Sequence, residues 1–157
     1  KYSQALSFKQ KALEMWEPLS RNSLQDLSLR YGMIKTKAGI GLIHAKLGDR
    51  KAALSECSQV VTLLNKIEDD PNNTGLRTMR AEVYAELAAV YVALAMVAHT
   101  NSERREHWRS ARDTFQTSLD IWVDMRNRGI ITDMAASTPE EIQREIAKCD
   151  AALSRLK

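Results

Sequence analysis

The stretch from Tyr84 to Ala98 constrains the fold of this chain more than any other part of its sequence. It contains one charged residue, Glu86, and otherwise consists mainly of alanine and of larger apolar side chains, a composition that favours helix over strand. Its apolar residues surround the whole helix, which is typical of a helix covered by several neighbours. The run is shorter than the roughly 18 to 20 apolar residues of a membrane span. The sequence therefore predicts a central helix in an all-α fold.

The length and the charge of the chain limit the number of domains and the classes of partner that it can have. A chain of 157 residues is long enough for one domain with its own hydrophobic core. The formal charge of +3, from 23 basic and 20 acidic residues, does not by itself indicate binding to nucleic acid or to an anionic membrane. Cys57 and Cys149 are far apart and lack metal-ligand spacing, so we expect reduced, buried thiols. Without a signal peptide, the expected location is cytoplasmic.

Helical periodicity and stop signals predict about six helices and no strands. Gly48 followed by Asp49 ends one helix and caps the next, and the turn-rich segment 68–75 is the clearest loop. Asn101 and Ser102 are expected to cap the fifth helix, and Thr138 with Pro139 to begin the last one. The predicted units are a partial repeat 2–20, repeats 23–67 and 76–128, and a capping helix 138–157.

Internal repetition links the first, third and fifth predicted helices. When they are aligned on Ala5, Ala53 and Ala111, mostly apolar residues recur at the next positions on the same helix face. The later aligned positions are Lys9, Cys57 and Phe115, then Ala12, Val60 and Ser118, then Leu13, Val61 and Leu119, then Trp16, Leu64 and Trp122. Helix pairs that repeat in this way become stable by stacking on one another.

The intervening helices share a second pattern, in which a large residue precedes a small one at Ile40-Gly41 and at Leu87-Ala88. Gly41 and Ala88 are therefore predicted to allow close helix crossings. Three to four residues later stand His44 in one helix and Tyr91 in the other. Together with Tyr84 and the Leu47-Gly48-Asp49 stop, this pattern resembles the tetratricopeptide repeat (TPR) family.

The match has two departures: His44 replaces the usual tyrosine, and the aligned alanines are 48 and 58 residues apart where the family repeat is about 34 residues. The resemblance implies a right-handed stack of antiparallel helix pairs with a C-terminal capping helix. It also implies a non-catalytic protein-interaction scaffold, as in the C-terminal region of a bacterial multidomain signalling protein. A serine/threonine protein kinase is the expected context, with any kinase activity in an upstream domain, because residues 1–157 contain no kinase motif.

The family's binding surface implies a groove along the second and fourth helices, occupied by a protein or peptide such as an amphipathic helix. Its predicted lining is Ala38, Leu42, Ala45, Ala85, Ala89, Val92 and Met96. Leu42→Asp or Val92→Asp is expected to abolish partner binding without unfolding the domain. The alternative is that upstream repeats or the last helix of this chain cover the groove. The Lys and Asn residues of a carboxylate clamp are absent, which argues against that TPR subtype.

No catalytic residue, metal site or cofactor is predicted, and His44 is interpreted as a core residue that fills an aromatic position. Two other functions are open. One is a structural or dimerising domain that pairs through the N-terminal face left by a missing first helix. The other is nucleic-acid binding by the basic cluster from Arg104 to Arg112 around Trp108. Interspersed acidic residues favour a solvated helix face instead, and neither nucleic acid nor membrane is an expected partner.

Overall fold

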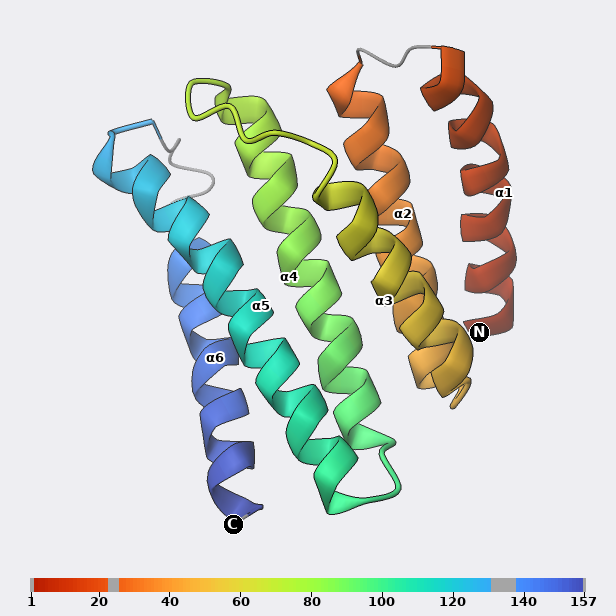
Figure 1. The fold of residues 1–157 in the computed structure, drawn as a ribbon, viewed down its shortest axis with the longest axis vertical. Helices are drawn as coiled ribbons and strands as arrows, with labels where there is room; N and C mark the ends of the chain where they lie inside the picture. The colour runs from red at the N-terminus through yellow and green to blue at the C-terminus, as the bar shows by residue number, and fades with distance from the viewer. Residues whose placement is uncertain (1, 23–25, 131–137, 157) are drawn as a thin grey trace.

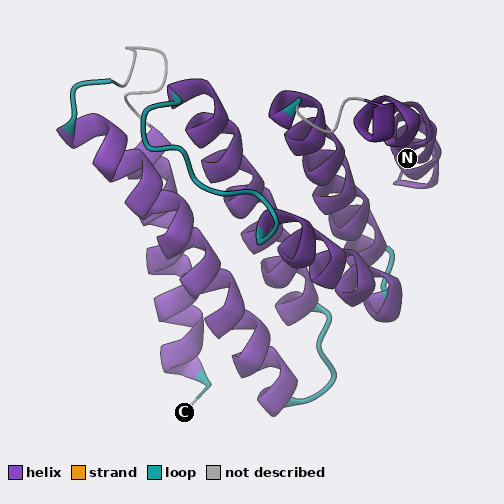
Figure 2. Cartoon of the chain, turned by 45° about the horizontal axis from the view of Figure 1, so that its top comes forward, coloured by secondary structure: helices purple, strands orange, loops and turns teal. Residues whose placement is uncertain are grey.

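The computed structural model describes residues 2–22, 26–130 and 138–156, and these form six α-helices without a strand in the described ranges (Figures 1 and 2). The predicted all-α class and number of helices are thereby confirmed. The helices are α1 (Tyr2–Asn22), α2 (Leu27–Lys46), α3 (Arg50–Leu64), α4 (Thr74–Met96), α5 (Asn101–Asn127) and α6 (Thr138–Arg155).

Consecutive helices run in opposite directions and pack side by side (Figure 1). The central helix α4 contacts α2, α3 and α5, as its apolar circumference predicts. At the two edges of the molecule, α1 packs mainly against α2 and α6 mainly against α5. The helices therefore form a row of hairpins, with α4 covered on several sides and α1 covered on one.

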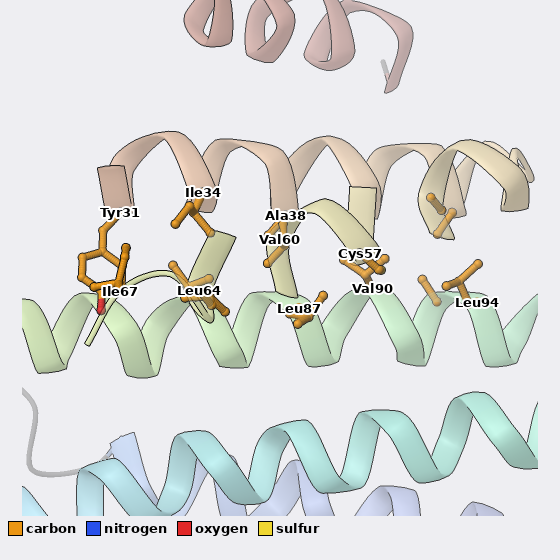
Figure 3. Close-up of a cluster of buried hydrophobic side chains, with 14 residues drawn as sticks. Tyr31, Ile34, Ala38, Cys57, Val60, Leu64, Ile67, Leu87, Val90 and Leu94 are labelled. Atoms are coloured by element: carbon orange, nitrogen blue, oxygen red, sulfur yellow. The ribbon is translucent and has the colours of Figure 1, made fainter. Parts of the chain in front are cut away.

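The hydrophobic core has two clusters, one on each side of α4. The first lies between α2, α3 and α4 and includes Ile34, Val60, Leu64, Leu87 and Leu94 (Figure 3). The second lies between α4, α5 and α6 and includes Ala88, Phe115, Trp122, Met125 and Ile146. Since α4 contributes to both clusters, it joins the two halves of the row.

Most of the aligned repeat positions point inward, whereas Val61 is 38% exposed. The buried residues of α3 are Ala53, Cys57, Val60 and Leu64, and all four correspond to positions of the sequence alignment. The equivalent residues of α5, Ala111, Phe115, Ser118 and Trp122, are buried too. In α1, Lys9 and Trp16 approach the backbone of α2 at Gly39 and Gly32. The alignment therefore identified the face by which each of these helices packs.

Gly41 provides the close crossing of α2 with α3 that the sequence predicts. A Cβ atom at this position would lie 3.2 Å from Glu56 Cβ and 3.6 Å from both the Ala53 carbonyl oxygen and Val90 Cγ1. Ala88, the other predicted crossing residue, is fully buried in the second cluster. Both small residues thus lie in helix interfaces.

Replacement of Gly41 with leucine is expected to lower the free energy of unfolding by about 1–3 kcal/mol, because the added carbons overpack a crossing limited by backbone atoms. Chemical denaturation followed by circular dichroism measures this change. Gly75→Leu is the matched control, since the only neighbour within 4 Å of a Cβ there is Asn73 Oδ1. A Gly41→Leu variant as stable as the Gly75→Leu variant would contradict the close crossing.

Local sequence signals predict most helix ends to within a few residues of their positions in the structure. Gly48 and Gly129 have positive φ values of 81° and 69°, and Asp49 caps α3 by accepting a hydrogen bond from the Ala52 amide at 3.1 Å. Helix α1 continues through Pro18 to Asn22, beyond the end of the predicted partial repeat 2–20. The first residues of the predicted repeat 23–67 lie outside the described residues, and Asp26 caps α2.

Helix α5 corrects one prediction. Its N-cap is Thr100 rather than Asn101 or Ser102, which are already helical. Thr100 Oγ1 accepts from the Glu103 amide at 3.1 Å, while the Glu103 carboxylate accepts from the Thr100 amide at 3.3 Å. This reciprocal pair satisfies two amides that would otherwise lack helical partners. The Thr100 to Glu103 spacing was the signal for this cap in the sequence.

Among the described residues, no helix combines the length and the apolar composition needed to cross a membrane.

Candidate partner-binding surfaces

The predicted groove along α2 and α4 is not an open surface over its whole length. Ala38 and Ala45 are 1% and 0% exposed and belong to the first core cluster. Their inclusion in the groove is wrong, because they lie on the side of α2 that packs against α3 and α4. Helix α2 packs against α1 as well as against α3 and α4, and the sequence alone did not show which of its small residues face these neighbours.

The other predicted groove residues differ in exposure. Leu42 packs against the first cluster, and Ala85 and Val92 pack against the second. Ala89 is half-buried, and Met96 is 72% exposed. Aspartate at position 42 or 92 would place a charge against apolar neighbours, so we expect it to destabilise the fold. These two variants therefore do not separate binding from folding, in contrast to the prediction from sequence.

Charged residues also lie along this face, which the sequence analysis had treated as apolar. Lys35 Nζ lies 2.6 Å from a Glu82 carboxylate oxygen and 3.8 Å from one of Glu86. Partial burial raises the pKa of Glu86, and the nearby ammonium groups of Lys35 and Lys9 oppose that rise. The α2–α4 face therefore has a charged middle with Met96 near one end.

A groove of about 420 Å³ lies instead where α1, α2 and α3 meet. Its lining is Glu17, Met33, Lys37, Ser58, Gln59, Thr62 and Leu63. Lys37 is held there by Gln59 Oε1 at 3.1 Å and by a Glu56 carboxylate oxygen at 3.9 Å. Because these residues come from three helices, no single stretch of sequence revealed the groove.

Three large apolar side chains are exposed on one side of α1. Phe8, Met15 and Leu19 are 74%, 69% and 50% exposed, and their spacing places them on one stripe of the helix. Of the eight large hydrophobic side chains that are exposed in the described residues, four belong to α1. We call Phe8, Met15 and Leu19 the α1 stripe.

Trp16 is apolar like the α1 stripe and lies at helical spacing from it in the sequence. The structure separates them. The Trp16 ring lies 3.4 Å from the position of a Cβ on Gly32, so Trp16 packs against α2, whereas the stripe faces away from the hairpin. An amphipathic pattern shows that a helix has an apolar side, but which apolar residues find a partner depends on the neighbouring helices.

The basic cluster of α5 is largely occupied by contacts within the chain. Arg104 donates to the Ala98 carbonyl at 3.0 Å, Arg105 donates to the Leu156 carbonyl, and Arg112 donates to Asp150 at 2.7 Å. His107 is 8% exposed, and its burial lowers its pKa. Arg109 is exposed. Most of these cations tie α5 to its neighbours and so offer little charge to a phosphate backbone.

Glu103 connects the N-termini of α3 and α5. Its carboxylate lies 2.8 Å from Arg50 Nη2. The hydrogen bond from Arg50, together with those from the Thr100 and His99 amides, lowers the pKa of Glu103 from 4.5 to about 2. The ionised carboxylate therefore stabilises the folded chain above the ordinary glutamate pKa, and this stabilisation is lost as the pH falls through about 2.

Glu103→Gln is expected to lower the melting temperature at neutral pH, since the amide retains the capping geometry but lacks the charge. The difference from the wild type should shrink as the pH is lowered toward 2, where the wild-type carboxylate is protonated as well. Thermal unfolding across this pH range measures the effect. A difference that is independent of pH would show that the ion pair with Arg50 does not contribute.

The groups available for chemistry are few. Cys57 and Cys149 are free and buried, and burial raises the pKa of these thiols to about 12 and about 11. Both are therefore protonated near neutral pH and weakly nucleophilic. His44 is half-buried, with Nδ1 3.6 Å from an Asp49 carboxylate oxygen. Within the described ranges, no group of three or more His, Cys, Asp or Glu residues has a metal-binding arrangement.

Comparison of the chain with models of known protein families, with curated proteins and with solved structures gives no significant match.

Proposed function

We propose that this chain is a non-catalytic protein-interaction module that binds an α-helix of a partner on the α1 stripe. The observation that carries the proposal is the exposure of Phe8, Met15 and Leu19 on one side of an edge helix. An exposed, continuous apolar patch is typical of an interaction surface. A partner with an apolar helical face is the chemistry that fits this stripe.

The internal repeat supports a helix as the occupant. The alignment on Ala5, Ala53 and Ala111 places Met15 opposite Leu63 and Ile121, and Leu19 opposite Ile67 and Met125. In the other two repeats these four positions are packed against neighbouring helices: Ile67, Ile121 and Met125 are buried, and Leu63 packs against the first cluster. The same positions on α1 remain exposed. A helix laid on the α1 stripe would therefore complete the packing seen in the other repeats.

The wider context that we propose is a TPR-like regulatory segment of a larger signalling protein, of which a serine/threonine protein kinase is one example. The antiparallel hairpins, the inward-facing repeat positions and the close crossing at Gly41 support the TPR-like part of this proposal. The signalling context rests on the resemblance in sequence alone.

Site-specific crosslinking tests the interaction function. A photoreactive phenylalanine derivative replaces Phe8 in the protein produced at its natural level in its own cells, and mass spectrometry identifies the crosslinked peptides. We expect crosslinks to apolar residues of a helix. The control carries the same derivative at Gln143, which is exposed on the outer side of α6. If position 8 gives no more crosslinks than position 143, the α1 stripe does not bind a protein.

A second comparison separates the α1 stripe from the groove expected from sequence. Met15 and Met96 are similarly exposed, at 69% and 72%, but they lie on α1 and on the α2–α4 face. Met15→Glu should abolish the crosslinks from position 8, whereas Met96→Glu should leave them unchanged. Loss of the crosslinks with Met96→Glu, and not with Met15→Glu, would show that the partner binds on the α2–α4 face.

A further inference from the structure

We propose that the helix bound on the α1 stripe is α1 of a second copy of this chain, so that two chains pair through their first helices in antiparallel orientation. This inference rests on the proposed interaction function and specifies the partner of the same surface. Helix α1 lies at the edge of the row and packs mainly against α2 (Figure 1). The described helices leave its outer side exposed, and this is the side on which we place the second chain.

The spacing of the stripe fits pairing between two helices. Phe8, Ala12, Met15 and Leu19 follow one another at intervals of four, three and four residues, which is the spacing of a two-helix seam. In an antiparallel pair with its two-fold axis between Ala12 and Met15, Phe8 of each copy meets Leu19 of the other. Met15 of each copy then lies over Ala12 of the other. Met15 therefore faces a small side chain that leaves room for it, while Phe8 packs against Leu19 of the symmetric copy.

The charges beside the stripe favour the antiparallel orientation. Lys11 and Glu14 are both exposed, and they lie on the same flank of the helix. In the antiparallel pair, Lys11 of each copy approaches Glu14 of the other, which gives two symmetric attractive pairs. In a parallel pair in register, this flank of one copy faces the opposite flank of the other, so Lys11 and Glu14 do not meet across the seam. Opposite charges across a helix seam select orientation and partner.

Sedimentation velocity over a range of protein concentrations tests the pairing with the purified chain. We expect a reversible monomer–dimer equilibrium. Met15→Glu should weaken self-association by at least about tenfold, because each interface loses two buried methionines. Met96→Glu, an equally exposed methionine on α4, should leave the dissociation constant unchanged. A wild-type chain that remains monomeric at the highest soluble concentration would overturn the inference.

Charge reversal tests the orientation. Lys11→Glu and Glu14→Lys should each weaken self-association by about tenfold, because both symmetric pairs become repulsive. A mixture of the two variants should form heterodimers as tightly as the wild type forms dimers, because the acidic helix faces the basic one. Circular dichroism confirms that each variant keeps its helix content. If the mixture associates no better than either variant alone, antiparallel pairing is wrong.

The crosslinking and sedimentation experiments separate the two proposals. Crosslinks from position 8 to α1 of another copy would support both the interaction function and the self-pairing. Crosslinks to a different protein, or to a segment of the same polypeptide outside residues 1–157, would leave the interaction function standing and overturn self-pairing. An absence of crosslinks would overturn the interaction function as well.

Discussion

Trp122→Ala is expected to lower the free energy of unfolding by about 3–5 kcal/mol, the cost typical of removing a large aromatic ring from a core. The Trp122 side chain is 4% exposed and lies in the second cluster, between α4, α5 and α6. The smaller side chain leaves a cavity that the surrounding helices fill only in part. Urea denaturation followed by circular dichroism measures the loss.

Trp108→Ala is the control for this change. Trp108 lies on the same helix and is only partly buried against the same cluster, so its replacement should remove less contact area and cost less. Equal losses for the two tryptophans would show that the second cluster is not centred on Trp122.

Leu87→Ala is expected to lower the free energy of unfolding by about 2–5 kcal/mol. Leu87 is 2% exposed and lies in the first cluster, where α4 meets α2 and α3 (Figure 3). Its loss should destabilise the whole domain, because the same helix also packs against α5. The midpoint of urea unfolding, compared with the wild type, gives the effect.

Met96→Ala on the same helix provides the matched control. With Met96 72% exposed, its replacement should change the stability by no more than about 0.5 kcal/mol. A loss as large as that for Leu87 would mean that Met96 is covered in solution, which would support a partner on the α2–α4 face.

Local sequence patterns predicted the helices and several of their ends. The apolar run from Tyr84 to Ala98 corresponds to most of α4, and its lack of a polar side predicted that α4 lies between other helices. Gly48 and Asp49 end α2 and cap α3 as expected. These features depend on residues that are close in the chain, because helix hydrogen bonds and caps join residues three or four positions apart.

The candidate surface was less predictable. Ala38 and Ala45 were expected in a groove and are buried, while the apolar side chains of Phe8 and Met15 are exposed. Arg104 and Arg112 were weighed as a basic surface, but they bind carbonyl or carboxylate groups of the chain. In each case the outcome depends on a partner group that is distant in sequence.

The sequence by itself determined the helical class, the number of helices and the inward-facing repeat positions, because helical periodicity and turn chemistry act over a few residues. Only the tertiary structure decided which apolar faces are covered. It placed α2, α3 and α5 around α4 and left the outer side of α1 without a neighbouring helix in the described chain. Burial is a property of pairs of surfaces, so it is established only when the helices have packed.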